Sequence, residues 1–157
     1  MITFIGDFQC KVDEKGRIVL SAALKKAMAD ETRFVVRKDL FEECLVLYPY
    51  SYWEEELLKL RKKLNPYNRE HKSFLRDFFK STVEVSLDAN GRFLIPKRLA
   101  EKVKINREVI LIGVDRYIEL WSKELYDQMD EDGDTLANQA QMFLGHLDDI
   151  YNTQSDE

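Results

Sequence analysis

A motif of one aspartate, one glycine and one arginine occurs twice in this chain, and these residue types can organise a tight turn or bind an anion. Its two copies lie in VDEKGRIVLS and LDANGRFLIP, and the residues are Asp13, Gly16, Arg17, Asp88, Gly91 and Arg92. Each residue of the second copy lies 75 positions after its counterpart. An aspartate side chain accepts hydrogen bonds from nearby backbone N–H groups, and glycine adopts positive φ at no steric cost, so both copies predict turns. The constant offset indicates an internal duplication.

The aspartate and arginine of each motif have two possible roles. In a structural role, the carboxylate satisfies N–H groups of the turn, and the guanidinium pairs with a carboxylate of the same or the other repeat. We favour this role for Asp13, Asp88 and Arg92. In a binding role, the arginine faces a phosphate group.

The residues around the two arginines differ in charge. Lys11 and Lys15 lie near Arg17, whereas the matching positions of the second copy are Ser86 and Asn90. Phosphate contacts in nucleic-acid complexes come largely from Lys and Arg. If one face of the pseudo-symmetric pair binds phosphate, it should therefore be the face of the first repeat.

Residues typical of enzyme and metal sites are few. His71 and His146 are the two histidines, and neither has a Cys, Ser or second His at the spacing of a metal site or a catalytic triad. The six glycines are scattered and form no phosphate-binding loop. Cys10 and Cys44 lie in apolar, strand-like segments, which favours two reduced core thiols. We expect no catalytic residue, no metal, no cofactor and no small-molecule substrate.

Charge is distributed unevenly along the chain. The net charge of the 157 residues is −5. Residues 124 to 157 hold ten acids and no Lys or Arg, so the remaining 123 residues carry a net charge of +5. This asymmetry permits binding of a polyanion by the repeats, although a solvated acidic face is the common alternative. The sequence has no apolar run long enough to span a membrane, so we expect no membrane span. No basic segment followed by an apolar one occurs at the N-terminus, so we expect no secretory signal and a cytoplasmic protein.

The same order of elements is expected in both repeats. A strand leads into each turn, and a second strand, a short helix and a pair of strands follow. Ser21 and Pro96 stand where the two short helices begin. The expected strand pairs cover residues 33–38 with 44–49 and 108–113 with 117–122.

Longer helices are expected after each repeat. Trp53, Leu57, Leu60 and Leu64 share one helical face, Asn65-Pro66 ends that helix, and a second helix directs Phe74, Leu75 and Phe78 inward. Near the C-terminus an apolar stripe predicts a helix that packs on a core or on a neighbouring subunit, and its residues are Leu136, Ala140, Phe143, Leu147 and Ile150.

Neither repeat is large enough to bury a stable hydrophobic core alone. We therefore expect a mixed α+β, β-rich fold in which the two copies pair around a pseudo-twofold axis, with their strands interleaved into one small barrel or sheet and helices flanking it. The expected divisions are residues 1–64, a helical spacer at 65–79, a second unit at 80–126 and an acidic amphipathic tail at 127–157.

The sequence resembles the MraZ family over about residues 1 to 145. The resemblance rests on the two D-x-x-G-R turns, the L-I-P after the second, and the strand pairs ending in CLVLYP and YIELW. It implies two tandem swapped-hairpin units of the AbrB type. The chain departs from the family pattern at Ser21, where members usually carry Pro, and in the less arginine-rich helix that follows.

The resemblance also implies a function. Members are bacterial transcriptional regulators linked to the division and cell-wall gene cluster, so we expect a homo-oligomeric ring that binds repeated promoter elements of double-stranded DNA and associates with the nucleoid. Carried over by position, Arg17 matches the arginine on the DNA-contacting side, with Lys15 beside it. Asp13 matches an acidic residue that organises the turn or a subunit contact, and Asp88 and Arg92 match the second copy.

An alternative class is an interaction module. Swapped-hairpin folds also occur in antitoxins, where a DNA-binding half carries a tail that neutralises a toxin, and acidic residues 124–157 could serve in that way. Two complete units and an amphipathic tail helix favour the regulator instead, because such antitoxins resemble one unit joined to a disordered segment.

Overall fold

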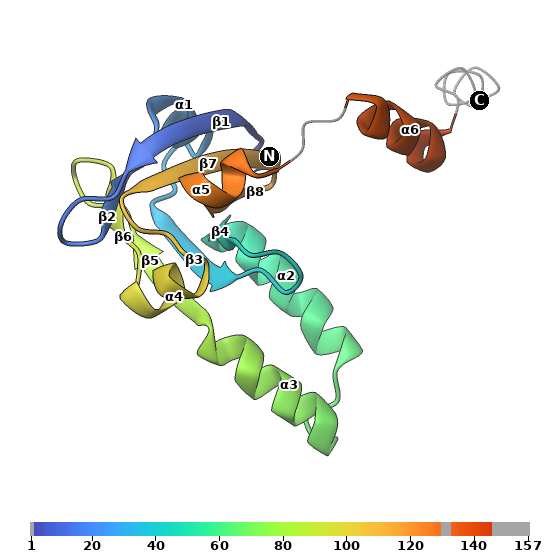
Figure 1. Ribbon diagram of the computed structural model, residues 1–157. Coiled ribbons are helices and arrows are strands. Elements are labelled where there is room, and N and C mark those ends of the chain that lie inside the picture. The colour runs from blue at the N-terminus through green and yellow to red at the C-terminus, as the bar shows by residue number, and fades with distance from the viewer. Residues whose placement is uncertain (1, 130–132, 146–157) are drawn as a thin grey trace. The chain divides into compact units, whose positions relative to one another are not determined.

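The computed structural model describes residues 2–129 and 133–145. The chain divides into one compact unit of residues 1–127 and a second of residues 128–157. Within the described residues, the first unit contains a six-stranded sheet, a two-stranded ribbon and short and long helices, a mixed α+β fold (Figure 1).

The first repeat and the two long helices that follow it occupy residues 4 to 80. Their elements are β1 (Phe4–Lys11), β2 (Arg17–Val19), α1 (Ala22–Ala27), β3 (Arg33–Lys38), β4 (Leu45–Pro49), α2 (Tyr50–Lys63) and α3 (Arg69–Lys80). The second repeat has the same order: β5 (Thr82–Ser86), β6 (Arg92–Leu94), α4 (Lys97–Lys102), β7 (Glu108–Asp115), β8 (Tyr117–Ser122) and α5 (Lys123–Asp127). The second unit contains α6 (Gly133–Leu144). The predicted strand pairs are confirmed, and so are the predicted helices, the C-terminal one as far as Leu144.

The strands of the two repeats are interleaved. The sheet has the order β1-β7-β8-β4-β3-β5, and β2 pairs with β6 in a separate ribbon. Every pairing is antiparallel. The counterparts in the two repeats are β1 and β5, β2 and β6, β3 and β7, and β4 and β8. When each strand is replaced by its counterpart, the order of the sheet is reversed and every strand pairing is kept. Among the described strands, β1 and β5 are the edges of the sheet and do not pair with each other.

The cross-repeat register preserves this symmetry. In the ribbon, Ile18 lies opposite Phe93, its own counterpart 75 positions later. In the sheet, Val46 lies opposite Glu119, its counterpart at the reduced offset of 73. A carboxylate thus replaces an apolar side chain at the centre of the sheet, and burial raises the pKa of Glu119.

Two apolar clusters cover the two faces of the sheet. Along β3, Phe34 and Val36 belong to one cluster and Val35 to the other, as the alternation of a strand requires. The first cluster joins the sheet to the ribbon and to α1 and α4, through residues such as Ile18, Leu24, Phe34, Phe93 and Leu99. The second joins it to α2 and α3, through Val46, Tyr48, Trp53, Phe78 and Trp121. Both repeats contribute to each cluster.

The short helices begin differently. The Ser21 hydroxyl accepts a hydrogen bond from the Leu24 N–H at 3.3 Å, as a side-chain cap does. Pro96 occupies the cap position itself and not the first helical turn, and α4 has no side-chain cap. The helices therefore start at equivalent places with different chemistry.

Helices α2 and α3 form an antiparallel hairpin whose inner contacts are aromatic (Figure 1). The rings of Trp53 and Phe78 stack with centroids 6.0 Å apart and planes 5° from parallel. The inward prediction holds for buried Phe78. It is wrong for Phe74, which is 41% exposed and lies beside the Phe78 ring, with the two ring centroids 5.9 Å apart and the ring planes tilted by 30°.

In α6, the predicted apolar stripe is exposed within its own unit. Leu136 is 70% exposed and Phe143 is 74% exposed. Leu147 and Ile150 lie outside the described residues, as do His146 and most of the acids of the predicted tail.

Candidate nucleic-acid interface

The first motif forms a closed turn between β1 and β2. The Asp13 N–H donates to the Arg17 carbonyl at 2.9 Å, and the Gly16 N–H donates to the Asp13 carbonyl at 3.0 Å. Gly16 has φ 83°, a conformation that costs other residues a clash between Cβ and the backbone. This geometry explains why the motif contains a glycine one residue before the arginine.

The Asp13 carboxylate holds both the backbone and the arginine of this turn. Its Oδ1 accepts from the N–H groups of Lys15 and Arg17, both at 2.9 Å, and its Oδ2 accepts from Arg17 Nε at 2.7 Å. The Arg17 N–H is the main reason that the pKa of Asp13 lies below its usual value. Arg17 is therefore fixed through Nε, and its side chain remains 31% exposed.

The second motif repeats this arrangement. Asp88 accepts from the N–H groups of Asn90 at 2.8 Å and Arg92 at 2.9 Å, and from Arg92 Nε at 3.0 Å. Gly91 has φ 73°. The backbone N–H of Arg92 again lowers the pKa of the aspartate. The two motifs thus have one geometry, and only their surroundings distinguish them.

Each turn is attached to the other repeat. The Ile95 N–H donates to the Gly16 carbonyl at 3.0 Å, and the Leu20 N–H donates to the Gly91 carbonyl at 2.9 Å. These two bonds extend the β2–β6 ribbon beyond its three paired positions. Each turn is consequently positioned by the strand that follows the other turn.

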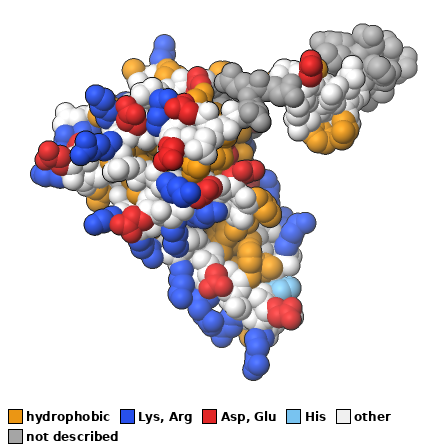
Figure 2. All heavy atoms as spheres, in the orientation of Figure 1, with side chains coloured by type: hydrophobic (Ala, Val, Ile, Leu, Met, Phe, Trp, Pro, Cys, Tyr) orange, Lys and Arg blue, Asp and Glu red, His pale blue; other side chains and the backbone are white. Residues whose placement is uncertain are grey.

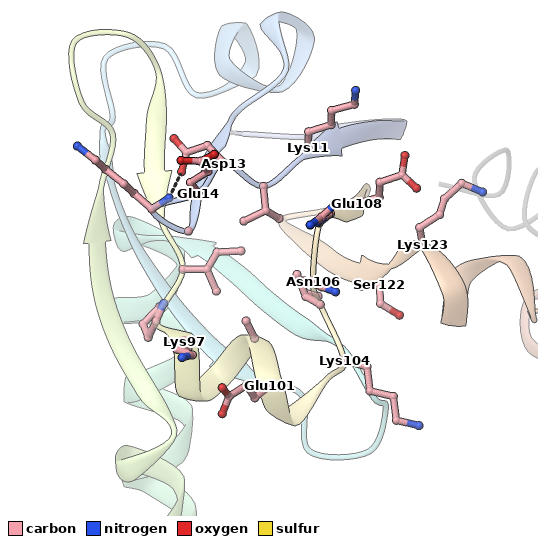
Figure 3. A pocket seen from close by; sticks show the side chains of 18 of the residues that line it. Lys11, Asp13, Glu14, Lys97, Glu101, Lys104, Asn106, Glu108, Ser122 and Lys123 are labelled. Atoms are coloured by element: carbon pink, nitrogen blue, oxygen red, sulfur yellow. Dashed lines mark hydrogen bonds between the residues drawn. The ribbon is translucent and has the colours of Figure 1, made fainter.

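A groove of about 1510 Å³ separates the first turn from α4 and β7 (Figure 3). Lys11, Asp13 and Lys15 line it, whereas Arg17 does not. The groove has six cationic and six acidic lining residues: Lys11, Lys15, Lys97, Lys104, Arg107, Lys123, Asp13, Glu14, Glu101, Glu108, Glu124 and Asp127. In Figure 3 the ends of Lys11, Lys104 and Lys123 extend away from its centre. The groove is balanced in charge, and the ends of these three lysines lie at its margins.

Sequence reasoning missed two cations because they approach a turn from the other repeat. Lys97 of α4 lines the same groove as the first turn. Lys25 of α1 lies beside the second turn, where its Nζ is 3.2 Å from the position that a Cβ on Gly91 would occupy. The second turn therefore has a neighbouring cation that its own segment lacks. No local sequence pattern marks these two lysines. They could have been found only from the pairing of strands between the two repeats, which brings each short helix close to the turn of the other repeat.

The described residues offer little for other chemistry. Among them, no group of three or more His, Cys, Asp or Glu side chains is placed to hold a metal ion. His71 Nδ1 accepts a hydrogen bond from the Asn65 N–H at 2.9 Å, a local contact within the helical hairpin. Cys44 is fully buried, and burial raises the pKa of its thiol. No described helix is long and apolar enough to cross a membrane.

Comparison with known proteins identifies the family of the chain. A family model described as "MraZ protein, putative antitoxin-like" matches twice, at residues 3–77 and 78–144. A protein of Bacteroides thetaiotaomicron named "Transcriptional regulator MraZ" is 42% identical over 130 residues, which cover 82% of this chain and 83% of the relative. Proteins of the same name from Christiangramia forsetii and Flavobacterium psychrophilum are 38% and 34% identical, with coverage of 94% and 95% of this chain and 97% and 96% of the relatives. The two matched segments correspond to the two repeats, and the chain belongs to the MraZ family.

Proposed function

We propose that this protein is a transcriptional regulator that binds double-stranded DNA through its first turn. Lys11, Lys15 and Arg17 are the proposed DNA contacts, and Asp13 holds the turn in place for them. The observation that carries the proposal is that the first turn adds two lysines of its own segment to a held arginine, because Arg92 of the second turn is held in the same way as Arg17. One carboxylate fixes the Nε of Arg17, while its side chain stays 31% exposed. A cation held in this way loses little conformational freedom when it meets a phosphate or a base edge.

The second motif has the structural part of this role in our proposal. Gly91, Asp88 and Arg92 close the second turn, whose bond to Leu20 supports the ribbon. The segments of the two turns differ in Lys11 and Lys15, which Ser86 and Asn90 replace in the second copy, whereas the cation beside the second turn is Lys25 of α1. The names of the relatives support regulation of transcription, and the three cations of the first turn, Lys11, Lys15 and Arg17, support DNA as the partner.

We further propose a homo-oligomeric ring that contacts repeated promoter elements of the division and cell-wall gene cluster. One subunit offers few cations, and each phosphate contact contributes little at cellular salt. Several subunits presenting the same turn at regular spacing would raise the effective concentration of each contact. In this proposal the units are swapped hairpins of the AbrB type that form a pseudo-twofold barrel, divided at residues 1–64, 65–79, 80–126 and 127–157. The protein would act in the cytoplasm at the nucleoid, with no cofactor and no catalytic step.

Fluorescence anisotropy on labelled DNA tests this function. The purified full chain is titrated onto duplexes carrying tandem copies of the region upstream of its own gene, and onto scrambled duplexes, across a salt series. We expect tighter binding to the upstream duplex and a linear fall of log affinity with log salt. Equal binding to both duplexes at every salt, by folded protein, would contradict sequence-specific regulation.

A second candidate is an antitoxin-like module, which the description of the family model also names. In that case the acidic C-terminal region would bind a basic protein partner. Failure to bind any duplex, together with tight binding of a basic partner that truncation after residue 127 abolishes, would favour this candidate over the regulator.

A further inference from the structure

One face of α3 carries a row of four cations. Arg69, Lys72, Arg76 and Lys80 follow one another at intervals of three, four and four residues, which places them on one side of the helix. All four side chains are exposed. Figure 2 shows Lys and Arg side chains gathered along a border of the α2–α3 hairpin. We call these four residues the α3 cationic row.

The charge of the α3 cationic row is not neutralised by its surroundings. Residues 59 to 80 contain eight Lys and Arg and only two acids, Glu70 and Asp77, which leaves a net charge of +6. Within the described part of the chain, no ion pair involves any member of the row. Lys59 of α2, by contrast, pairs with Glu56 at 3.2 Å.

The stability of the helix does not account for the row. Arg69 is the first residue of α3, where the helix dipole disfavours a cation. Lys72 and Arg76 are four residues apart, as are Arg76 and Lys80, and like charges at this spacing destabilise a helix. Only Lys80, in the last turn, is favoured by the dipole. The row therefore costs stability that a bound anion would restore.

The scaffold beneath the row is firmly held. The Asn68 side chain caps α3 by accepting from the N–H groups of Glu70 at 2.9 Å and His71 at 3.1 Å. On the opposite side of the helix, Phe78 stacks on Trp53, and the Arg37 guanidinium of β3 lies 5.0 Å from the centre of the Phe78 ring. The helix backbone is thus anchored to α2 and the sheet, so a ligand need not order it.

We propose that the α3 cationic row binds the phosphate backbone of duplex DNA outside the segment that the first turn contacts. This inference rests on the proposed function and extends the DNA-binding surface to the helical hairpin. At 1.5 Å per residue, the row extends about 16 Å along the helix, and a DNA backbone is a polyanion with regularly spaced charges that can follow such a line. Because phosphates carry no base identity, these contacts strengthen binding without selecting a sequence.

The test compares the salt dependence of DNA affinity for matched single variants of the full chain. Arg76→Gln removes a charge from the row, and Lys59→Gln removes one from the same hairpin but outside the row. Both are measured by anisotropy on the duplex with tandem upstream copies and on a scrambled duplex. For Arg76→Gln we expect the slope of log affinity against log salt to fall by about 0.9 for each engaged subunit, on both duplexes. Lys59→Gln should keep the wild-type slope.

A double variant, Lys72→Gln with Arg76→Gln, should lose about twice as much slope while its helical circular dichroism stays unchanged. Wild-type slope or tighter binding in this variant would overturn the inference and leave the proposed function in place, since the wild-type protein still binds. If the wild-type protein binds neither duplex, the proposed function fails and this inference fails with it. Equal loss of slope in Arg76→Gln and Lys59→Gln would also overturn the inference, because net charge and not the row would then govern binding.

Discussion

The carbonyl oxygen of Gly16 accepts a hydrogen bond from the N–H of Ile95 at 3.0 Å, and this bond joins the first turn to the strand that follows the second turn. Its symmetric partner runs from the Leu20 N–H to the Gly91 carbonyl. The two turns are therefore mechanically coupled, and the orientation of Arg17 depends on residues of the second repeat. A change in either repeat can alter the proposed DNA contacts.

Arg17→Ala should weaken DNA binding strongly and leave the oligomer folded. The ion pair with Asp13 is exposed, so its loss should change the free energy of unfolding by less than about 1 kcal/mol. Loss of one cation in each subunit should lower affinity by at least about tenfold, because the effect is repeated across the assembly. Anisotropy and analytical ultracentrifugation provide the two measurements. Arg92→Ala is the matched control, and we expect it to affect assembly or nothing; an equal loss of DNA binding in both variants would contradict the asymmetry between the turns.

Gly113→Ala should destabilise the sheet where β1 and β7 approach each other. A Cβ on Gly113 would lie 2.5 Å from the Ile5 nitrogen and 2.6 Å from the Phe4 carbonyl carbon, so the backbone of β1 must move. We expect the free energy of unfolding to fall by about 1–3 kcal/mol, as overpacking of a well-filled site does. Urea denaturation followed by circular dichroism measures it. Gly133→Ala, where nothing lies within 4 Å of the added Cβ, is the control and should show no loss; equal stability of the two variants would refute the close approach.

The two turns should be sensitive to acid. Hydrogen bonds in the folded protein hold the pKa of Asp13 and Asp88 below the usual carboxyl value. Their contribution to stability is therefore complete above the unfolded pKa of about 3.9 and is lost as the pH falls below it toward the folded values. The double variant Asp13→Asn with Asp88→Asn should lower the urea midpoint at pH 7 and show a smaller further fall between pH 5 and pH 3 than the wild type. An identical acid dependence in both proteins would mean that other carboxyl groups govern it.

Phe78→Ala should loosen the helical hairpin from the sheet. Phe78 is 9% exposed and stacks on Trp53, and truncation of a buried phenylalanine costs about 3–5 kcal/mol in well-packed cores. We expect the lower end of that range, because the site lies at the margin of the second cluster. Tyr67→Ala, at a position that is 96% exposed, should leave the thermal midpoint unchanged. Comparable losses in both variants would show that the stack contributes little.

The elements of the repeats were predictable because their signals are local. Asp13 and Gly16 determine a turn through their own hydrogen bonds and φ, and Ser21 begins a helix through its own hydroxyl. Alternation along residues 33–38 likewise marks a strand without reference to its partners. Turns, helix starts and strand alternation of this kind are determined by a few neighbouring residues, so they occur in both repeats.

Partner choice was less accessible from the sequence. Symmetry predicted that the repeats interleave, but no local pattern states that β1 pairs with β7, about a hundred residues away. Lys25 therefore could not be assigned to the second turn, nor Lys97 to the groove that the first turn lines. Phe74 was misplaced for a related reason: helical periodicity identifies a face of α3, but the burial of each residue on that face depends on its partner, and it is Phe78 that stacks on Trp53.

The interleaved order of the sheet has a consequence for how the chain folds. During synthesis, β1 emerges first and its partner β7 emerges last but one among the described strands, so the first repeat cannot complete its core until the second is available. Contacts between residues so far apart in the sequence slow folding. Until the second repeat is available, the first repeat exposes unpaired strand edges. The two repeats therefore behave as obligate partners, because each needs strands of the other to complete its core. The covalent link between them keeps their local concentration high.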